Sequence, residues 1–144
     1  MSEARIAEQF HDLFKGASLG QLATLRADGT PHLTPVWVDI DADGRVLVNA
    51  RADRVKSAQM RERPAVAVCV VDAENPYRYV SVTGVVEAVE EEGALEHMDL
   101  LARRYLRVRK YPWAAPGERR LLFRIRPTRV IADSGAVCLP EPEL

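Results

Sequence analysis

Basic side chains are crowded into one short stretch of the chain, Ala52 to Pro64, which reads ADRVKSAQMRERP. It follows the apolar run RVLVNA, although the whole chain has a formal net charge of only -1. If a helix begins near Asp53, Arg54 and Lys56 fall in its first turn, where free N–H groups and the helix dipole disfavour cations. Either this is an ordinary solvent-exposed helix, as most charged runs are, or an anionic ligand neutralises its start.

Helical geometry divides these basic residues into two groups. At 3.6 residues per turn, Arg61 lies below Arg54, whereas Lys56 and Arg63 lie on nearly the opposite side. A single ligand therefore cannot contact all of them. We take Arg54 and Lys56 as the candidate anion-binding residues and expect Arg61 and Arg63 at the surface.

A second candidate site is the segment TPVWVD, residues 34–39. Pro35 lacks a ladder donor, which predicts that its strand lies at a sheet edge or a barrel opening. There the backbone groups of Val36 and Trp37 could bond a ligand's heterocycle instead of a neighbouring strand. The alternative is that Trp37 is a core residue, as tryptophan usually is.

Two further segments combine aromatic and basic side chains. The run RRYLRVRKYPWAAPGERR, 103–120, suits a lid over an anionic ligand, a subunit contact or nucleic acid, but the acidic block 87–96 argues against a broadly basic face. The turn in DAENPYRY presents Tyr77, Arg78 and Tyr79 at the start of a strand. Such side chains can stack on a flat ring, but they more commonly form a rim or dimer contact.

Composition excludes several classes of protein. The balance of 20 basic against 21 acidic residues argues against a general nucleic-acid binder. Cys69, in the apolar run AVAVCVV, is expected to be a small buried side chain, and neither it nor Cys138 has the spacing of a metal site. No apolar run approaches the ~20 residues of a membrane span. We therefore expect a cytoplasmic protein with no metal and no membrane partner.

The motifs of common enzyme classes are missing from the sequence, which has no Walker loop, GxGxxG, GxSxG or HExxH. Asp39 and Asp41 lie beside a hairpin turn, where aspartate is expected. Nothing therefore indicates general acid-base or nucleophilic catalysis. What remains is cofactor chemistry, in which the protein orients a reactive ligand and needs few catalytic groups of its own.

The elements that would position these residues follow from periodicity and turns. A helix is predicted over 4–15, where apolar residues recur at helical spacing. Two Asp-Gly turns divide residues 18–50 into a three-stranded antiparallel meander. Asp53 is the predicted N-cap of the next helix, which ends at Pro64.

The second half of the chain alternates in the same way. AVAVCVVD is predicted to be a strand buried on both faces, and YRYVSVTGVVEAV a long strand in which Gly84 marks a bulge or a close backbone approach. EEEGALEHMDLLARRYL is predicted to be helical, and ERRLLFRIRPTRVIA to close the sheet. Six antiparallel strands with short flanking helices predict one mainly β (α+β) domain, residues 1–144, folded as a closed or split barrel.

The order of these features resembles the pyridoxamine 5'-phosphate oxidase-like split-barrel flavoproteins, and more closely their flavin/deazaflavin oxidoreductase branch, which uses coenzyme F420. The matching segments are LATLRADGTPHLTPVW, VNARADRVK, RERPAVAVCVVD, NPYRYVSVTGVVE and LARRYL, within residues 6–133. The resemblance implies a six-stranded antiparallel split β-barrel that forms a homodimer. It also implies two cofactors, bound in grooves at the subunit interface.

The resemblance further implies which residues bind the cofactor. Strand residues 34–37 would face the tricyclic ring, Arg54 and Lys56 would hold the phosphate, and residues 77–79 would come from the partner subunit. Arg104, Tyr105 and Trp113 are further candidates. The predicted cofactor-binding residues are Thr34, Pro35, Val36, Trp37, Asn49, Ala50, Arg54, Val55, Lys56, Tyr77, Arg78 and Tyr79.

By this resemblance, the chain is predicted to be an oxidoreductase that moves a hydride between reduced F420 and a small conjugated or planar substrate. The acidic tail of F420 would favour extra basic groups, which Arg51, Arg61 and the 103–110 cluster could supply. FMN has no such tail, and an FMN-dependent oxidase or reductase is one alternative; a non-catalytic flavin carrier is another. No essential acid or base is predicted, since solvent or a hydroxyl such as that of Tyr79 could supply a proton.

Overall fold

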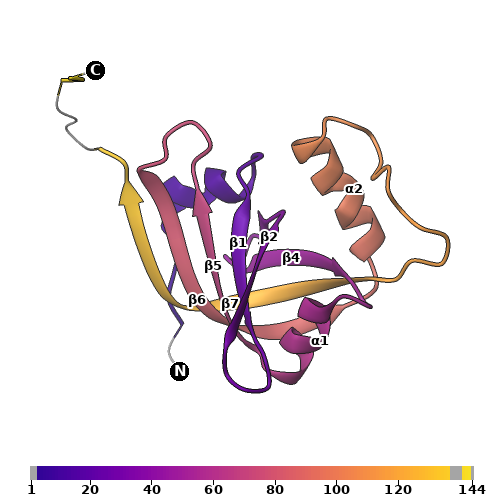
Figure 1. The fold of residues 1–144 in the computed structure, drawn as a ribbon. Coiled ribbons are helices and arrows are strands. Elements are labelled where there is room, and N and C mark those ends of the chain that lie inside the picture. The colour runs from indigo at the N-terminus through magenta and orange to yellow at the C-terminus, as the bar shows by residue number, and fades with distance from the viewer. Residues whose placement is uncertain (1–2, 137–140, 144) are drawn as a thin grey trace.

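The computed structural model describes residues 3–136 and 141–143, which form one strongly curled antiparallel sheet with helices packed around it (Figure 1). A 3-10 helix, η1 (Glu8–Phe14), precedes the sheet, and α1 (Val55–Glu62) and α2 (Ala94–Tyr105) are inserted between strands. The seven strands are β1 (Gly20–Leu25), β2 (Pro31–Val36), β3 (Asp39–Ile40), β4 (Val46–Arg51), β5 (Ala65–Val71), β6 (Arg78–Glu90) and β7 (Arg120–Ser134).

The strand order is β2-β1-β5-β6-β7-β4-β3, and every pairing is antiparallel. β6 and β7 are long enough to serve both halves of the barrel, because the start of β6 pairs with β5 while the start of β7 pairs with β4. Only Trp37 and Val38 separate β2 from β3. The two ends of the sheet therefore lie next to each other although no strand pairing joins them, which makes the barrel a split one.

The bend in the long strands is encoded at Gly84, which lies opposite Pro127. The register shifts between Thr83 and Gly84, and a Cβ atom on Gly84 would lie only 2.6 Å from the carbonyl oxygen of Arg126. Pro127 has no N–H to offer the ladder at this point. The predicted close approach at Gly84 is confirmed, as a β-bulge in the bent pair.

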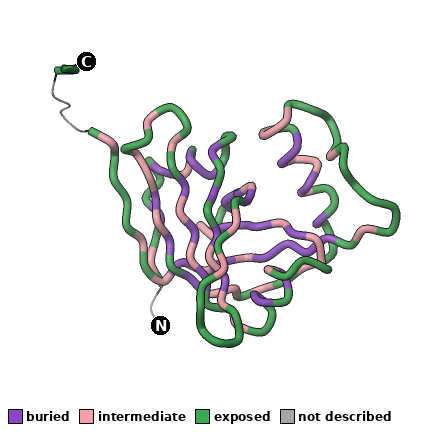
Figure 2. Tube along the Cα trace, viewed as in Figure 1, coloured by how far each residue is buried: buried purple, intermediate pink, exposed green. Residues whose placement is uncertain are grey.

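The hydrophobic core lies inside the curl of the sheet. Buried residues alternate with exposed ones along the strands (Figure 2), and Leu22, Val68, Val80 and Phe123 are fully buried. The helix η1 adds the fully buried Phe14 to the same cluster. This alternation fixes the strand registers, because a slip by one residue would turn every apolar side chain outward.

Strand number and pairing differ from the sequence prediction in two respects. The sheet has seven strands instead of six, because the short strand β3 pairs with β4. Residues 18–50 do not form a three-stranded meander, because β4 pairs with β7 and not with β2. β4 lies between β3 and β7 in the sheet. Its residues Val46, Leu47 and Val48 are buried, so both of its faces are covered. β2 is an edge strand, as Pro35 predicts.

The predicted helix boundaries also need correction. The helix predicted over 4–15 is a shorter 3-10 helix, because the Ala4 N–H donates to the Pro127 carbonyl (2.9 Å) and ties the preceding segment to the sheet. Asp53 does not cap α1: Arg54 occupies the N-cap position, and the Asp53 carboxylate accepts two hydrogen bonds from Arg51. The helix ends before Pro64, as predicted.

The outer face of β5 is not buried, in contrast to the sequence prediction. Ala65 and Val71 are exposed and Cys69 is only half-buried, because no described element covers that face. Burial still raises the pKa of the Cys69 thiol. Cys138 lies outside the described residues. Among those residues, no helix has the length and apolar character needed to cross a membrane.

Candidate functional site

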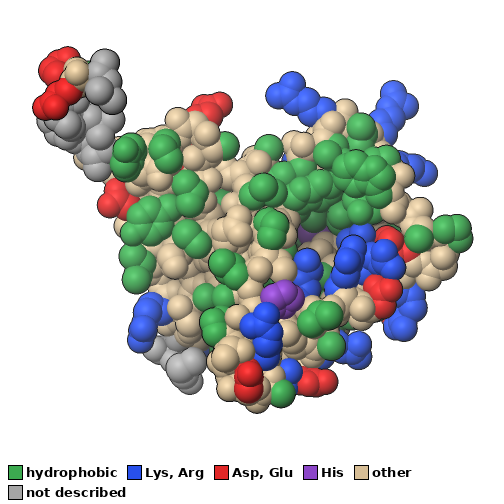
Figure 3. Space-filling view, viewed as in Figure 1, with side chains coloured by type: hydrophobic (Ala, Val, Ile, Leu, Met, Phe, Trp, Pro, Cys, Tyr) green, Lys and Arg blue, Asp and Glu red, His purple; other side chains and the backbone are tan. Residues whose placement is uncertain are grey.

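Most of the predicted cofactor-binding residues line one groove of about 520 Å³ between β2, β4, the start of α1 and the loop after α2. Figure 3 shows hydrophobic side chains gathered at α2 and, below them, Lys and Arg side chains around a hollow. The groove is lined by Leu19, Thr34, Pro35, Val36, Trp37, Asn49, Ala50, Arg51, Arg54, Lys56, Met98, Tyr111, Trp113 and Arg120.

The cations of the groove differ in how their charge is compensated. Arg51 donates two hydrogen bonds to Asp53, and Arg120 donates to the buried carboxylate of Glu118 at 2.8 Å. Within the described residues, neither Arg54 nor Lys56 forms an ion pair. Arg54 and Lys56 are thus the groove cations left for an external anion.

Lys56 is the more buried of these two unpaired cations. Burial, together with the nearby charges of Arg54 and Arg120, lowers the pKa of the Lys56 ammonium below its ordinary value. Its position in the first turn of α1 also sets it against the helix dipole. A bound anion would relieve all of these unfavourable contributions.

Four aromatic rings contact one another in series, and three of them, Trp37, Tyr111 and Trp113, line the groove. Trp37 stacks on Tyr105 with ring centroids 5.0 Å apart and planes 6° from parallel. Tyr111 meets Trp37 edge to face at 6.1 Å, and Trp113 meets Tyr111 at 5.7 Å. The guanidinium of Arg120 lies 4.8 Å from the Tyr111 centroid. We call Trp37, Tyr105, Tyr111 and Trp113 the aromatic wall.

The loop that carries Tyr111 and Trp113 is tied to the body of the protein. The Tyr111 N–H donates to Asp99 of α2 at 2.9 Å, and the Tyr105 hydroxyl donates to the Ser18 carbonyl at 2.7 Å while accepting from the Val38 N–H. The loop after α2, for which the sequence leaves a lid and a subunit contact open, is therefore anchored to the rest of the protein. The side chain of Arg103 in α2 also binds this loop, since it donates to the Arg109 carbonyl at 3.2 Å.

Asn49 is one of the residues that line the groove, and its side-chain amide has an unusual set of contacts. Its Nδ2 donates to the Ala94 carbonyl at 2.7 Å and lies 3.2 Å from Nδ1 of His97. Its Oδ1 is buried and has no hydrogen-bond partner among the described residues. A buried acceptor without a partner destabilises a protein by about 1–3 kcal/mol. Such an atom is expected where a ligand completes the site.

The edge of β2 offers further polar groups. β2 pairs with β1 on one side only, so alternate backbone N–H and C=O groups of residues 34–36 have no strand partner on the other. The Trp37 side chain borders the same edge and is half-buried, so it serves the groove as well as the packing. This is the geometry that the sequence predicts for the TPVW segment.

Four of the predicted cofactor-binding residues do not line the groove of their own chain. Val55 is exposed on α1. Tyr77 is exposed at the turn before β6, and Tyr79 is half-buried in β6. Arg78 is engaged by Asp12, Asp72 and the Gln9 carbonyl. Residues 77–79 therefore do not line the groove of their own chain, and their predicted contribution from a second subunit stays a prediction.

Some groove residues escape the sequence prediction, among them Leu19, Met98 and Arg120. Arg120 had a usable signal, because it continues the alternating series of Leu122 and Arg124 along β7. Met98 and Leu19 carry no signal, since single apolar residues on a helix or before a strand usually enter the core.

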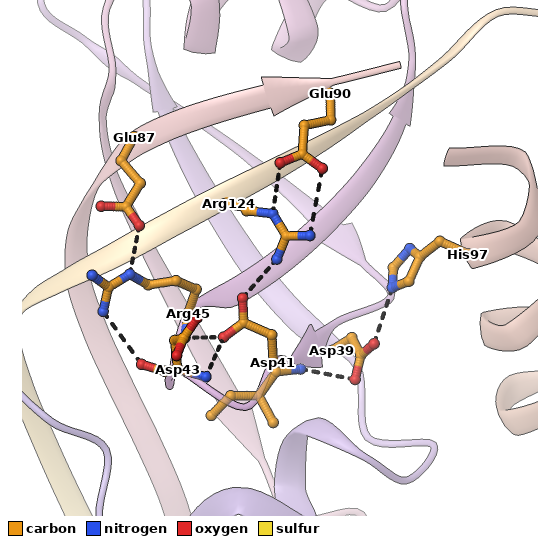
Figure 4. A network of polar contacts seen from close by, with 9 residues as sticks. Asp39, Asp41, Asp43, Arg45, Glu87, Glu90, His97 and Arg124 are labelled. Atoms are coloured by element: carbon orange, nitrogen blue, oxygen red, sulfur yellow. Dashed lines mark hydrogen bonds and ion pairs between the residues drawn. The ribbon is translucent and has the colours of Figure 1, made fainter. Parts of the chain in front are cut away.

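A larger hollow of about 700 Å³ lies elsewhere, at the Asp41–Arg45 turn. Figure 4 shows its charged side chains paired with one another: Arg45 with Glu87, and Arg124 with Glu90 and Asp41. These ion pairs satisfy one another and hold the turn to β6 and β7. The paired charges of Arg45 and Arg124 contrast with those of Arg54 and Lys56 in the groove, which have no ion-pair partner among the described residues.

Comparisons with known proteins agree with the fold. The family model described as pyridoxamine 5'-phosphate oxidase matches residues 6–132. The chain belongs to the pyridoxamine 5'-phosphate oxidase-like family. A solved F420 reductase is 31% identical with a TM-score of 0.76, and the match covers 88% of this chain and 98% of that one. The expected branch of the family, the one that uses F420, is thereby supported.

Two other solved structures illustrate the spread of the family. A conserved hypothetical protein from Mycobacterium tuberculosis, Rv2991, is 26% identical with a TM-score of 0.74, over 100% of this chain and 95% of that one. A putative pyridoxamine 5'-phosphate oxidase from Listeria innocua is 16% identical with a TM-score of 0.64, over 87% and 95% of the two chains, and shows the fold alone. No curated protein matches the chain.

Proposed function

We propose that the protein is an oxidoreductase that binds coenzyme F420 in the groove and transfers a hydride between this cofactor and a small planar substrate. The observation that carries the proposal is one groove that combines two unpaired cations, Arg54 and Lys56, with the aromatic wall and the free edge of β2. The likeness to the F420 reductase supports the choice of cofactor.

The residues of the groove fit the chemical parts of a flavin-like cofactor. Arg54 and Lys56 would hold the phosphate through charge-assisted hydrogen bonds. The free backbone groups of residues 34–36 and the Asn49 oxygen would serve the polar edge of the ring. The aromatic wall offers flat apolar surface to a planar substrate.

The chemical step asks little of the protein beyond position and shielding. Bound F420 supplies the ring carbon that carries the hydride. Trp37, Tyr111 and Trp113 would exclude water and orient the substrate over the ring, which removes much of the entropic part of the barrier. Solvent, or Tyr79 of the partner subunit, would supply a proton.

FMN is the second candidate cofactor, and one observation favours it. The basic cluster 103–110, expected to meet the acidic tail of F420, is partly engaged elsewhere, because Arg104 donates to Asp39 and Arg103 to the Arg109 carbonyl. Arg61 lines a neighbouring hollow with Arg51 and Arg119 and remains available to such a tail. FMN has no acidic tail, so its binding would not require the side chains of Arg103 and Arg104 that are engaged elsewhere.

We also propose that the protein is a homodimer joined through the outer face of β1, β2 and β5. Ala23 of β1 lies directly opposite Leu33 of β2 and Ala67 of β5, so the three side chains lie side by side on this face. The Leu33 side chain is 64% exposed. An open apolar sheet face of this kind marks a protein contact. Leu19 and Pro35 lie at its border and also line the groove. A second subunit there would adjoin the cofactor.

Side-by-side titration of F420 and FMN into the purified protein tests the proposal. The double variant Arg54→Ala, Lys56→Ala should weaken binding by about 10-fold to 100-fold for each lost contact, since a charge-assisted hydrogen bond contributes about 1.5–3 kcal/mol. Arg61→Ala is the matched control and should leave FMN binding unchanged.

Turnover then separates an enzyme from a carrier. Reduced F420 is mixed with a panel of enones and quinones, and its oxidation is followed spectroscopically. Tight F420 binding without turnover of any substrate would favour a carrier, and tight FMN binding without F420 binding would replace the proposed cofactor. Unchanged affinity in the double variant would overturn the phosphate assignment.

A further inference from the structure

The orientation of the Asn49 amide is fixed by its surroundings. If the amide were reversed, Oδ1 would stand where Nδ2 now stands, 2.7 Å from the Ala94 carbonyl oxygen, and two acceptors would repel each other. Nδ2 therefore stays on the side of α2, with its second hydrogen directed at Nδ1 of His97. The oxygen is left as the buried, unpartnered acceptor.

This arrangement determines the tautomer of His97. Nδ1 must accept from Asn49, so the ring proton resides on Nε2 and is donated to Asp39 Oδ2 at 3.0 Å (Figure 4). The other Asp39 oxygen accepts from Arg104 at 2.7 Å and from the Ile40 N–H at 2.8 Å. A continuous chain thus runs from Arg104 through Asp39 and His97 to Asn49.

Asp39 remains ionised at the centre of this chain. Burial opposes its charge, but the hydrogen bonds from His97, Arg104 and the Ile40 N–H outweigh burial and hold the Asp39 pKa below its ordinary value. An ionised carboxylate only accepts, so it keeps the proton on Nε2 of His97. Three residues from β3 and α2, namely Asp39, His97 and Arg104, thereby fix the orientation of the Asn49 amide.

We propose that Asn49 determines specificity, its oxygen accepting a hydrogen bond from an N–H of the bound ring, and that His97, Asp39 and Arg104 are positioning residues that hold it for this purpose. The inference rests on the proposed function and deepens it. Flavin and deazaflavin rings both carry a cyclic imide N–H, which is the donor that such an acceptor selects. A ligand without that donor leaves the acceptor unpaired, which sites of this kind reject.

The first measurement needs no ligand. Nitrogen-15 NMR of the wild-type protein should show His97 with its proton on Nε2. In Asp39→Asn, Arg104 and the Ile40 N–H retain the side-chain oxygen, so the new NH₂ group faces Nε2 and the proton moves to Nδ1, as in a triad whose aspartate is replaced by asparagine. A wild-type proton on Nδ1 would overturn the relay whatever the protein binds.

The second measurement uses F420, FMN and the N3-methyl derivative of each. Wild-type protein should bind the unmethylated form of its cofactor about 10-fold or more tightly than the methylated form, because a buried unpaired group costs about 1–3 kcal/mol. Asn49→Leu, which removes the acceptor, should lose most of this preference. Asp39→Asn should lose it in part while keeping the phosphate contacts.

Asp41→Asn is the matched control, since Asp41 lies two residues away but belongs to the separate Arg124 network of Figure 4. It should keep both the His97 tautomer and the N3 preference. Equal binding of methylated and unmethylated ligands to the wild type means that no ring N–H reaches the Asn49 oxygen, and overturns the inference while the proposed function stands. A wild type that binds neither ring overturns the proposed function and the ring contact together.

Discussion

Lys56 combines a half-buried position with two neighbouring cations, Arg54 and Arg120. In the ligand-free protein these contributions all oppose its charge. A residue so placed is unfavourable for folding at neutral pH and becomes favourable only when an anion arrives. Such local conflicts are typical of functional sites.

Lys56→Met is accordingly expected to raise the free energy of unfolding of the ligand-free protein at pH 7, measured by urea denaturation. The sign follows from the lowered pKa of Lys56 in the folded protein. At pH values between this lowered pKa and the ordinary value of 10.5, the unfolded chain binds more protons than the folded protein. The stability of the wild type therefore rises with pH in this range. The advantage of Lys56→Met should be full at pH 7 and vanish near pH 10.5.

Lys15→Met provides the matched control, because Lys15 is exposed and lies outside the groove. It should change unfolding little at either pH. A Lys56→Met protein less stable than wild type at pH 7 would contradict the claim that the charge of Lys56 destabilises the ligand-free protein.

At the level of elements, Tyr105 fastens the end of α2 across the split in the barrel. Its hydroxyl accepts from the Val38 N–H at 3.1 Å and donates to the Ser18 carbonyl, while its ring supports Trp37. Burial raises the pKa of this hydroxyl, which stays protonated and able to donate. One side chain thus connects α2, the start of β1 and the turn between β2 and β3.

Tyr105→Phe is expected to lower the free energy of unfolding by about 1–3 kcal/mol, since it leaves the buried Val38 N–H without a partner. Thermal and urea unfolding measure the change. Tyr77→Phe, on an exposed tyrosine, should be neutral. If both variants unfolded like wild type, the Tyr105 bridge would have no stabilising role.

The bend at Gly84 gives a second prediction for the elements. Gly84→Ala places a methyl group 2.6 Å from the Arg126 carbonyl oxygen, and the backbone must move, at a cost of about 1–3 kcal/mol. Gly16→Ala is the control, because its new methyl group would meet only Asp12 O at 3.6 Å. Urea denaturation should separate the two variants clearly. Equal stability would mean that the long strands bend freely.

Features set by neighbouring residues could be predicted from the sequence. The Asp-Gly turns, the end of α1 before Pro64 and the edge position of β2 at Pro35 each follow from local backbone chemistry. The partner of β4 could not be predicted, because β7 lies some seventy residues away and the choice depends on burial of both faces. The same holds for Asp39, whose partners His97 and Arg104 come from a distant helix.

At the level of the whole molecule, the open apolar face is the feature that a monomer would leave unexplained. Ala67→Glu places a charge between Ala23 and Thr83 at the centre of this face. Analytical ultracentrifugation should show a dimer for the wild type and a monomer for the variant. Cofactor affinity should fall together with dimerisation, because residues 77–79 of the second subunit would be lost.

Ala27→Glu, in the exposed turn between β1 and β2, is the control and should remain dimeric. A monomeric wild type that binds cofactor with full affinity would refute both the dimer and the contribution of residues 77–79. A dimeric Ala67→Glu protein would place the contact on another face.

The pairing of β4 with β7 also determines when the groove can first exist during synthesis. β1, β2, α1 and β5 all leave the ribosome before β7, yet β4 has no partner except β3 until β7 follows. Until β7 is made, Asn49 and Ala50 therefore lie on a strand edge whose backbone N–H and C=O groups are unpaired. Chaperones can bind such an edge, and other chains can aggregate on it. We expect a nascent chain to acquire its cofactor only after the last strand has been made.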